Sequence, residues 1–243
     1  MARFSGVSIV RFTLRLIALL RTLATLLTLH SLWRALRLPS PWPRRFLRAF
    51  GHIAGARARV TGTPLTRDVV FLSNHLSWID IPVLAGVTGT AFVAKAELDD
   101  IPVIGWLCRL NDTLFVRRGD RMGIGEQVRS IADAIATGRA VTLFPEGTTG
   151  DGVALLPFKS TLLAVLEPPP PGLMVQPVRI DYGPATPELA WVGEETGQAH
   201  AARVFRRAAT FTVNLHFLQP FAPADHPGRK AIAAEARRRI EAA

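Results

Sequence analysis

The chain has 243 residues, one cysteine and a formal net charge of +10 at pH 7. This length suits one domain with a substantial hydrophobic core. The lone Cys108 excludes an internal disulfide and a cysteine-ligated metal cluster.

The positive charge belongs to one end of the chain. Twelve arginines and no lysine precede the first acidic residue, Asp68, whereas the rest of the chain holds 17 basic and 19 acidic residues. A basic segment of this kind can bind nucleic acid, but here the arginines are interleaved with long aliphatic runs that nucleic acid does not require. An anionic membrane surface accounts for both features. We therefore expect a lipid surface, and no nucleic acid, as a partner.

Residues 7–38 form the first predicted element, which is rich in Leu, Ile and Val. Its longest uncharged stretch has 12 residues, whereas a spanning helix needs about 20. On a helix, four arginines fall within a sector of roughly 120° and leucines fill much of the rest; these are Arg3, Arg11, Arg15 and Arg21. We predict a helix lying in the membrane interface with its guanidinium groups at the lipid head groups. A true span and a helix docked on its own domain are the alternatives.

From about residue 57 the chain alternates strand-like and helix-like segments. Five short apolar runs are typical of buried strands: residues 69–73, 91–94, 113–116, 140–144 and 173–180. Residues 211–218 alternate and indicate a late strand. Helical patterns lie at residues 78–87, 101–110, 123–137, 159–166 and 228–243. This order predicts the α/β class, with a mixed, mostly parallel sheet flanked by helices.

A histidine and an aspartate follow the first predicted strand, in the segment Asn74-His75-Leu76-Ser77-Trp78-Ile79-Asp80. An imidazole suits proton removal from an alcohol near neutral pH, and a carboxylate bonded to its other nitrogen fixes the tautomer. The two residues meet if His75 lies on the turn before a helix and Asp80 lies in the first turns, with Asn74 or Ser77 as the cap. The alternative role for His75 is structural, as part of a helix cap.

Basic residues directly follow each of the next two predicted strands. Lys95 follows one of them, and Arg117 and Arg118 follow the other. Arginine binds phosphate through paired, forked hydrogen bonds, so we expect Arg118, and with it Arg117 and Lys95, at the phosphates of a substrate. A solvated basic face is the alternative.

A polar, glycine-rich loop follows the strand predicted at residues 140–144. In this loop Glu146 and Gly147 precede Thr148 and Thr149. Its glycines let backbone N–H groups approach an anionic or polyhydroxy head group, and its threonines offer hydroxyls. Glu146 either binds an acceptor hydroxyl or organises the loop. A tight connection without a ligand is the alternative, and no cluster with metal-ligand spacing is present in the sequence.

His-x4-Asp after one strand and Pro-Glu-Gly-Thr after a later one together resemble the glycerolipid acyltransferases, the family of 1-acylglycerol-3-phosphate acyltransferases. The resemblance implies His75 as general base and Asp80 as the group that orients it. It also implies substrate contacts for Glu146 and its neighbours. Arg118 matches an arginine of the family, whereas Thr149 stands where the family usually has an arginine linked to the acceptor phosphate. Lyso-ornithine lipid, or another lysolipid, is therefore the alternative acceptor to 1-acylglycerol-3-phosphate.

The resemblance implies an O-acyltransferase of membrane phospholipid synthesis. It would move a fatty acyl chain from acyl-CoA or acyl carrier protein, used as a co-substrate, to a lysolipid hydroxyl without any further cofactor. The expected domains are a membrane-anchoring segment, residues 1–50, and an acyltransferase domain, residues 51–243. We expect peripheral attachment to the cytoplasmic face of the inner membrane. A non-catalytic lipid-binding scaffold on the same fold is the alternative from another class.

Overall fold

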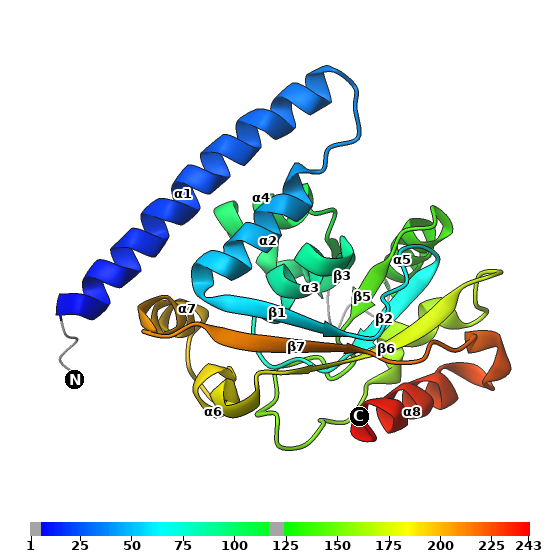
Figure 1. Cartoon of the computed structure of the whole chain (residues 1–243). Coiled ribbons are helices and arrows are strands. Elements are labelled where there is room, and N and C mark those ends of the chain that lie inside the picture. Colours follow the sequence, from blue (N-terminus) through cyan, green and yellow to red (C-terminus); the bar gives the residue numbers. More distant parts are fainter. Residues whose placement is uncertain (1–5, 117–123) are drawn as a thin grey trace.

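The computed structural model describes residues 6–116 and 124–243, which form an α/β fold around a seven-stranded sheet (Figure 1). The strand order is β1-β7-β6-β2-β5-β3-β4. The strands are β1 (Ala56–Thr61), β2 (Val69–Ser73), β3 (Ala91–Lys95), β4 (Leu114–Val116), β5 (Val141–Leu143), β6 (Met174–Asp181) and β7 (Phe211–Phe217). All neighbouring pairs are parallel except β6 and β7. The expectation of a mixed, mostly parallel sheet is confirmed.

Helices cover both faces of the sheet. They are α1 (Gly6–Ala35), α2 (Trp42–Ala54), α3 (Asp80–Thr88), α4 (Pro102–Leu110), α5 (Ile124–Ala136), α6 (Thr186–Leu189), α7 (Gly197–Arg206) and α8 (Gly228–Glu241). Residues of β2 alternate between two cores: Val69 and Phe71 join the cluster that includes α3 and α7, and Val70 and Leu72 join the one that includes α5 and α8. Burial on both faces explains why this strand reads as a continuous apolar run.

The predicted strands are present to within about one residue at each end, and the helical segment at residues 159–166 is a 3-10 helix, Ser160–Leu166. Strand β1 and helices α6 and α7 were not predicted. β1 has the sequence ARARVT and is exposed beyond its first residue, so it lacks an apolar signal. β1 pairs with β7, and Ala56 lies opposite Phe211, which is 155 residues further along the chain. This pairing holds the segment as a strand although its composition gives no strand signal.

Helices α2 and α3 approach each other closely over the sheet. A Cβ atom at Gly86 would lie 2.8 Å from the Cα atom of Arg48, so only glycine permits this packing. The approach matters for function because α3 begins at Asp80.

Helix α1 is continuous over 30 residues and extends away from the sheet before the chain returns through α2 (Figure 1). By length and composition, residues 7–35 are long and apolar enough to cross a membrane, with a mean hydropathy of 1.6. The length of the uncharged stretch alone, 12 residues, had argued against a spanning helix. Arg11 and Arg15 correct another expectation. Their side chains donate to carbonyls at the end of α7, Arg11 to Arg206 O at 3.1 Å and Arg15 to Val204 O at 3.1 Å. The last carbonyls of a helix lack partners and carry partial negative charge, so they bind guanidinium groups in place of lipid head groups.

Candidate active site

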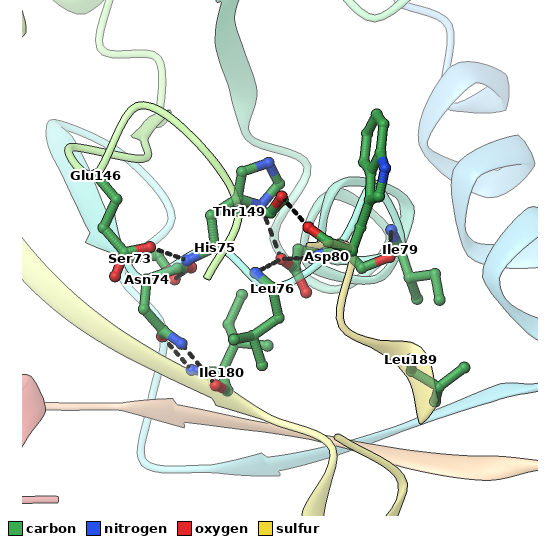
Figure 2. A network of polar contacts seen from close by, with 12 residues as sticks. Ser73, Asn74, His75, Leu76, Ile79, Asp80, Glu146, Thr149, Ile180 and Leu189 are labelled. Carbon is green, nitrogen blue, oxygen red and sulfur yellow. Dashed lines mark hydrogen bonds and ion pairs between the residues drawn. The ribbon is translucent and has the colours of Figure 1, made fainter. Parts of the chain in front are cut away.

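The loop between β2 and α3 is anchored to the neighbouring strand by Asn74. The Asn74 amide donates to Ile180 O at 2.8 Å, and its oxygen accepts from Ile180 N at 2.7 Å (Figure 2). Both capping expectations are therefore wrong, because the Asn74 side chain bonds to β6 and α3 begins without a side-chain cap. The Ser77 hydroxyl accepts a bond from Ile79 N at 3.3 Å, which does not cap the helix.

His75 and Asp80 meet as the sequence predicted. Nδ1 of His75 lies 2.8 Å from Oδ2 of Asp80, the first residue of α3 (Figure 2). The same oxygen accepts from the backbone N–H groups of Leu76 at 2.7 Å and Ser77 at 3.0 Å. Asp80 is fully buried, whereas the His75 side chain is 17% exposed. The imidazole also stacks on the Phe144 ring, with centroids 4.0 Å apart. The pair thus has a buried carboxylate and an imidazole that reaches the surface.

Tyr182 binds the other oxygen of the Asp80 carboxylate, to which its hydroxyl donates. Burial, together with the nearby charge of Asp80, raises the pKa of Tyr182 well above its usual value, so the phenol stays protonated and remains a donor. The backbone N–H groups of Leu76 and Ser77 can only donate to the carboxylate, which suits an ionised acceptor. His75 therefore keeps its proton on Nδ1. Within the described residues Nε2 has no protein partner, and its lone pair is available to a substrate.

Glu146 ties the second polar loop to the first. One carboxylate oxygen accepts from His75 N at 2.9 Å and the other from Leu156 N at 3.1 Å. In the same loop Gly150 N donates to His75 O at 2.8 Å. Burial raises the pKa of Glu146, and the two backbone donors oppose that rise. With both oxygens engaged and the residue only 3% exposed, the geometry favours the loop-organising alternative for Glu146.

The other residues expected in this loop differ in their surroundings. Gly147 is buried with φ at 73°, and its N–H donates to Phe144 O at 3.0 Å, a turn that requires glycine. Thr148 is exposed. The Thr149 hydroxyl donates to Trp191 O, so it fastens this loop to the segment before α7. Of the two threonines, Thr148 presents its side chain most openly.

The basic residues of the middle segment are only partly described. Lys95 is exposed at the carboxyl end of β3. β3 pairs with β5 in parallel, which puts Lys95 at the edge of the sheet where the His75 loop lies. No contact between Lys95 and that loop is among those identified in the described part of the chain. Arg117 and Arg118 lie outside the described residues.

The sequence analysis missed Tyr182 and the pair formed by Trp78 and His200. Trp78 Nε1 donates to His200 Nδ1 at 2.8 Å, and His200 Nε2 lies 3.0 Å from Leu189 O. Because an indole N–H only donates, His200 accepts at Nδ1 and donates from Nε2, so it is neutral. Burial lowers the pKa of His200 in agreement. The one available signal was composition, since Tyr182 is the only tyrosine of the chain and directly follows a buried strand.

This arrangement can take a proton and give it back. The imidazole has one nitrogen held by a buried anion and the other open to a ligand. An imidazolium formed there is stabilised by the carboxylate. Within residues 6–116 and 124–243, no three His, Cys, Asp or Glu side chains gather as a metal ion would need.

Comparison with known proteins places this chain in a family. Residues 44–181 match the family model described as Acyltransferase. The chain is 36% identical over 217 residues to a lyso-ornithine lipid O-acyltransferase of Rhizobium meliloti (strain 1021), covering 83% of this chain and 74% of that protein. It is also 36% identical over 94 residues to a 1-acyl-sn-glycerol-3-phosphate acyltransferase of Neisseria gonorrhoeae, covering 39% of this chain and 37% of that protein.

A solved structure shares the fold. The crystal structure of the 1-acyl-sn-glycerophosphate acyltransferase PlsC from Thermotoga maritima superimposes with a TM-score of 0.65 at 24% identity, over 96% of this chain and 95% of that one. The family model and the relatives together show that this chain belongs to the acyltransferase family and is an acyltransferase enzyme.

Proposed function

We propose that the protein is a lysolipid O-acyltransferase with His75 as its general base. The observation that carries this proposal is the 2.8 Å contact between His75 Nδ1 and the buried Asp80 carboxylate, inside the region that matches the family. The acceptor hydroxyl gives its proton to Nε2 while its oxygen attacks the carbonyl carbon of the acyl thioester. The C–S bond then breaks, and the imidazolium returns the proton to the departing sulfur. Asp80 holds the tautomer that this sequence of steps requires.

For the acceptor we favour lyso-ornithine lipid over 1-acylglycerol-3-phosphate, which the sequence alone had put first. Two relatives named lyso-ornithine lipid O-acyltransferase match 83% and 85% of this chain, whereas the Neisseria 1-acylglycerol-3-phosphate enzyme matches 39% of it. Position 149 supports this choice, because Thr149 is bonded to the Trp191 carbonyl and offers no cation to a phosphate. The donor is an acyl thioester of coenzyme A or acyl carrier protein. Thr148, Lys95, Arg117 and Arg118 remain our candidates for substrate contacts.

The N-terminal segment, residues 1–50, attaches the enzyme to the cytoplasmic face of the inner membrane in this proposal. Helix α1 exposes many large apolar side chains, such as Val10, Leu14 and Leu20, each more than half exposed. Its other side is attached to the body, where Phe12 packs against Phe205 of α7 with ring centroids 6.2 Å apart. A helix attached on one side and apolar on the other suits a position in the plane of the interface.

The decisive experiment supplies purified enzyme and a labelled acyl thioester with both lysolipids in competition. We expect label in the acylated product of lyso-ornithine lipid, and at least about a hundredfold slower formation of this product with the His75→Ala variant. Preferential labelling of the glycerophospholipid would reverse the choice of acceptor. No transfer to either lysolipid, with the lipids still bound, would support the non-catalytic scaffold.

A further inference from the structure

A cavity of about 390 Å³ opens between α2, α3 and the edge strand β1, away from the His75 network. Its size lies within the usual range for small-molecule sites. Three basic side chains line it, Arg48 and His52 from α2 and Arg57 from β1, and all three residues are exposed. The remaining lining residues are glycine, alanine and valine, including Val60, Val83 and Val87.

The positive charge of this cleft is not neutralised by nearby acids. Among the described residues its lining contains no acidic side chain, and no acid precedes Asp68 in the sequence. Arg48 and His52 are four residues apart on α2, which puts them on one face of the helix. Arg57 is held in place by bonds from Nη1 to His52 O and Ala56 O, both 3.0 Å. The guanidinium group has further N–H donors that a ligand could accept from.

The surrounding charges add to this excess. Burial first, and then repulsion from Arg11, Arg207 and Arg57, lowers the pKa of Arg15 at the junction of α1 with the body. Three of these four arginines belong to the first 60 residues, which hold no carboxylate. A bound anion at the cleft would relieve part of this repulsion.

The chemistry of the cleft selects an anion that also has an apolar part. Guanidinium groups bind phosphate oxygens through forked hydrogen bonds. The side chains of Val60, Val83 and Val87, called here the valine floor, offer apolar surface that a bound ligand would remove from water. Helix α2, which carries Arg48 and His52, also packs against α1, and α1 exposes many large apolar side chains. We propose that this cleft, lined by Arg48, His52 and Arg57, binds the phosphate of an anionic phospholipid of the membrane, with the glycerol and first methylene groups on the valine floor. This site is separate from the acyl-transfer site and goes beyond the proposed function.

The cleft shares helix α3 with the acyl-transfer site. Val83, Gly86 and Val87 of the cleft belong to α3, and α3 begins with Asp80. A lipid held here therefore contacts the helix that carries the partner of His75.

Two arginine pairs allow a test with equal change of charge. The cleft pair is Arg48→Gln with Arg57→Gln, and the control pair is Arg59→Gln with Arg67→Gln. Arg59 is exposed on the same strand as Arg57 but does not line the cleft, and Arg67 lies on the turn before β2. Flotation of the full-length chain would use vesicles of phosphatidylcholine with and without phosphatidylglycerol. We expect the cleft pair to lose about 20-fold in apparent affinity for the phosphatidylglycerol vesicles, and the control pair to lose about threefold or less.

Two further measurements separate the lipid from a free anion and from catalysis. Calorimetry should show saturable binding of dihexanoylphosphatidylglycerol that is at least about tenfold tighter than that of inorganic phosphate, because phosphate lacks the apolar contacts. Turnover on a short-chain, monomeric lysolipid should stay at the wild-type level in the cleft pair. Equal losses in both pairs, or phosphate binding as tight as the short-chain lipid, would overturn the proposal whatever the outcome for acyl transfer.

Discussion

Two histidines of this protein lie near the same loop and have opposite environments. His75, on the loop after β2, has one nitrogen bound to a buried carboxylate and 17% of its side chain exposed. His200, on α7, is fully buried between Trp78 and the Leu189 carbonyl. Both rings have their tautomer set by a neighbour, but only His75 leaves a nitrogen for a substrate.

The difference shows which surroundings make a histidine useful as a base. A carboxylate partner stabilises the protonated ring, whereas an indole donor excludes a proton from the nitrogen that it binds. Thus the surroundings of His75 accommodate a protonated ring, whereas a proton on Nδ1 of His200 would break its bond to Trp78. The loop that carries His75 and Trp78 is held by both bonds, because His75 contacts Asp80 and Trp78 donates to His200.

Replacing the exposed imidazole is expected to have the largest effect. His75→Ala removes the proton acceptor, so kcat should fall between about a hundredfold and ten-thousandfold while the fold survives. Steady-state acyl transfer and circular dichroism measure the two. His216→Ala is the matched control, because His216 also pairs with an aspartate, Asp181, at 3.2 Å. Comparable losses in both variants would remove the distinction that we draw for His75.

Altering the partner of that imidazole is expected to come next. Asp80→Asn keeps the shape but supplies an amide where donors converge, so the ring turns to the wrong tautomer and the imidazolium loses its anion. We expect kcat to fall about a hundredfold, with little change in KM for the acyl donor. Wild-type turnover in Asp80→Asn would show that the carboxylate does not act through His75.

Removing the buried phenol is expected to have a smaller effect. Tyr182→Phe deletes one donor to the Asp80 carboxylate, which should cost about 1.5–3 kcal/mol of unfolding free energy and reduce kcat about tenfold. The carboxylate then directs more of its charge toward the imidazolium, so the acid limb of the pH–rate profile should move to higher pH. A loss of stability with an unchanged profile would limit Tyr182 to packing.

The buried histidine should affect stability more than activity. Because the pKa of His200 is lowered in the folded state, the unfolded chain binds a proton that the folded chain does not as pH falls below about 6.5. Its contribution to stability is therefore complete above that pH and is lost as pH falls toward the folded pKa. His200→Gln retains an acceptor and a donor without titrating. Urea unfolding at several pH values should show a weaker decline in acid for this variant, with turnover nearly unchanged. Parallel declines would assign the acid sensitivity to other groups.

The sequence predicted those parts of the molecule whose signals are local. The His75–Asp80 pair was predictable because its members lie only five positions apart, and the central strands were predictable because burial on both faces leaves them uniformly apolar. Tyr182 was not, since it reaches Asp80 across 102 residues, and the Trp78–His200 bond joins residues 122 apart. Such contacts depend on which strands become neighbours. The edge strand β1 gave no signal because its arginines face solvent.

The bonds from Arg11 and Arg15 to the end of α7 fix the N-terminal helix to the catalytic body. If α1 lies in the membrane interface as proposed, any tilt that the bilayer imposes on α1 rotates the whole enzyme. The height of Nε2 of His75 above the lipid surface would then be fixed by the protein. In that proposed arrangement, the enzyme would select acceptors by the depth at which their hydroxyl lies, in addition to the chemistry of the head group.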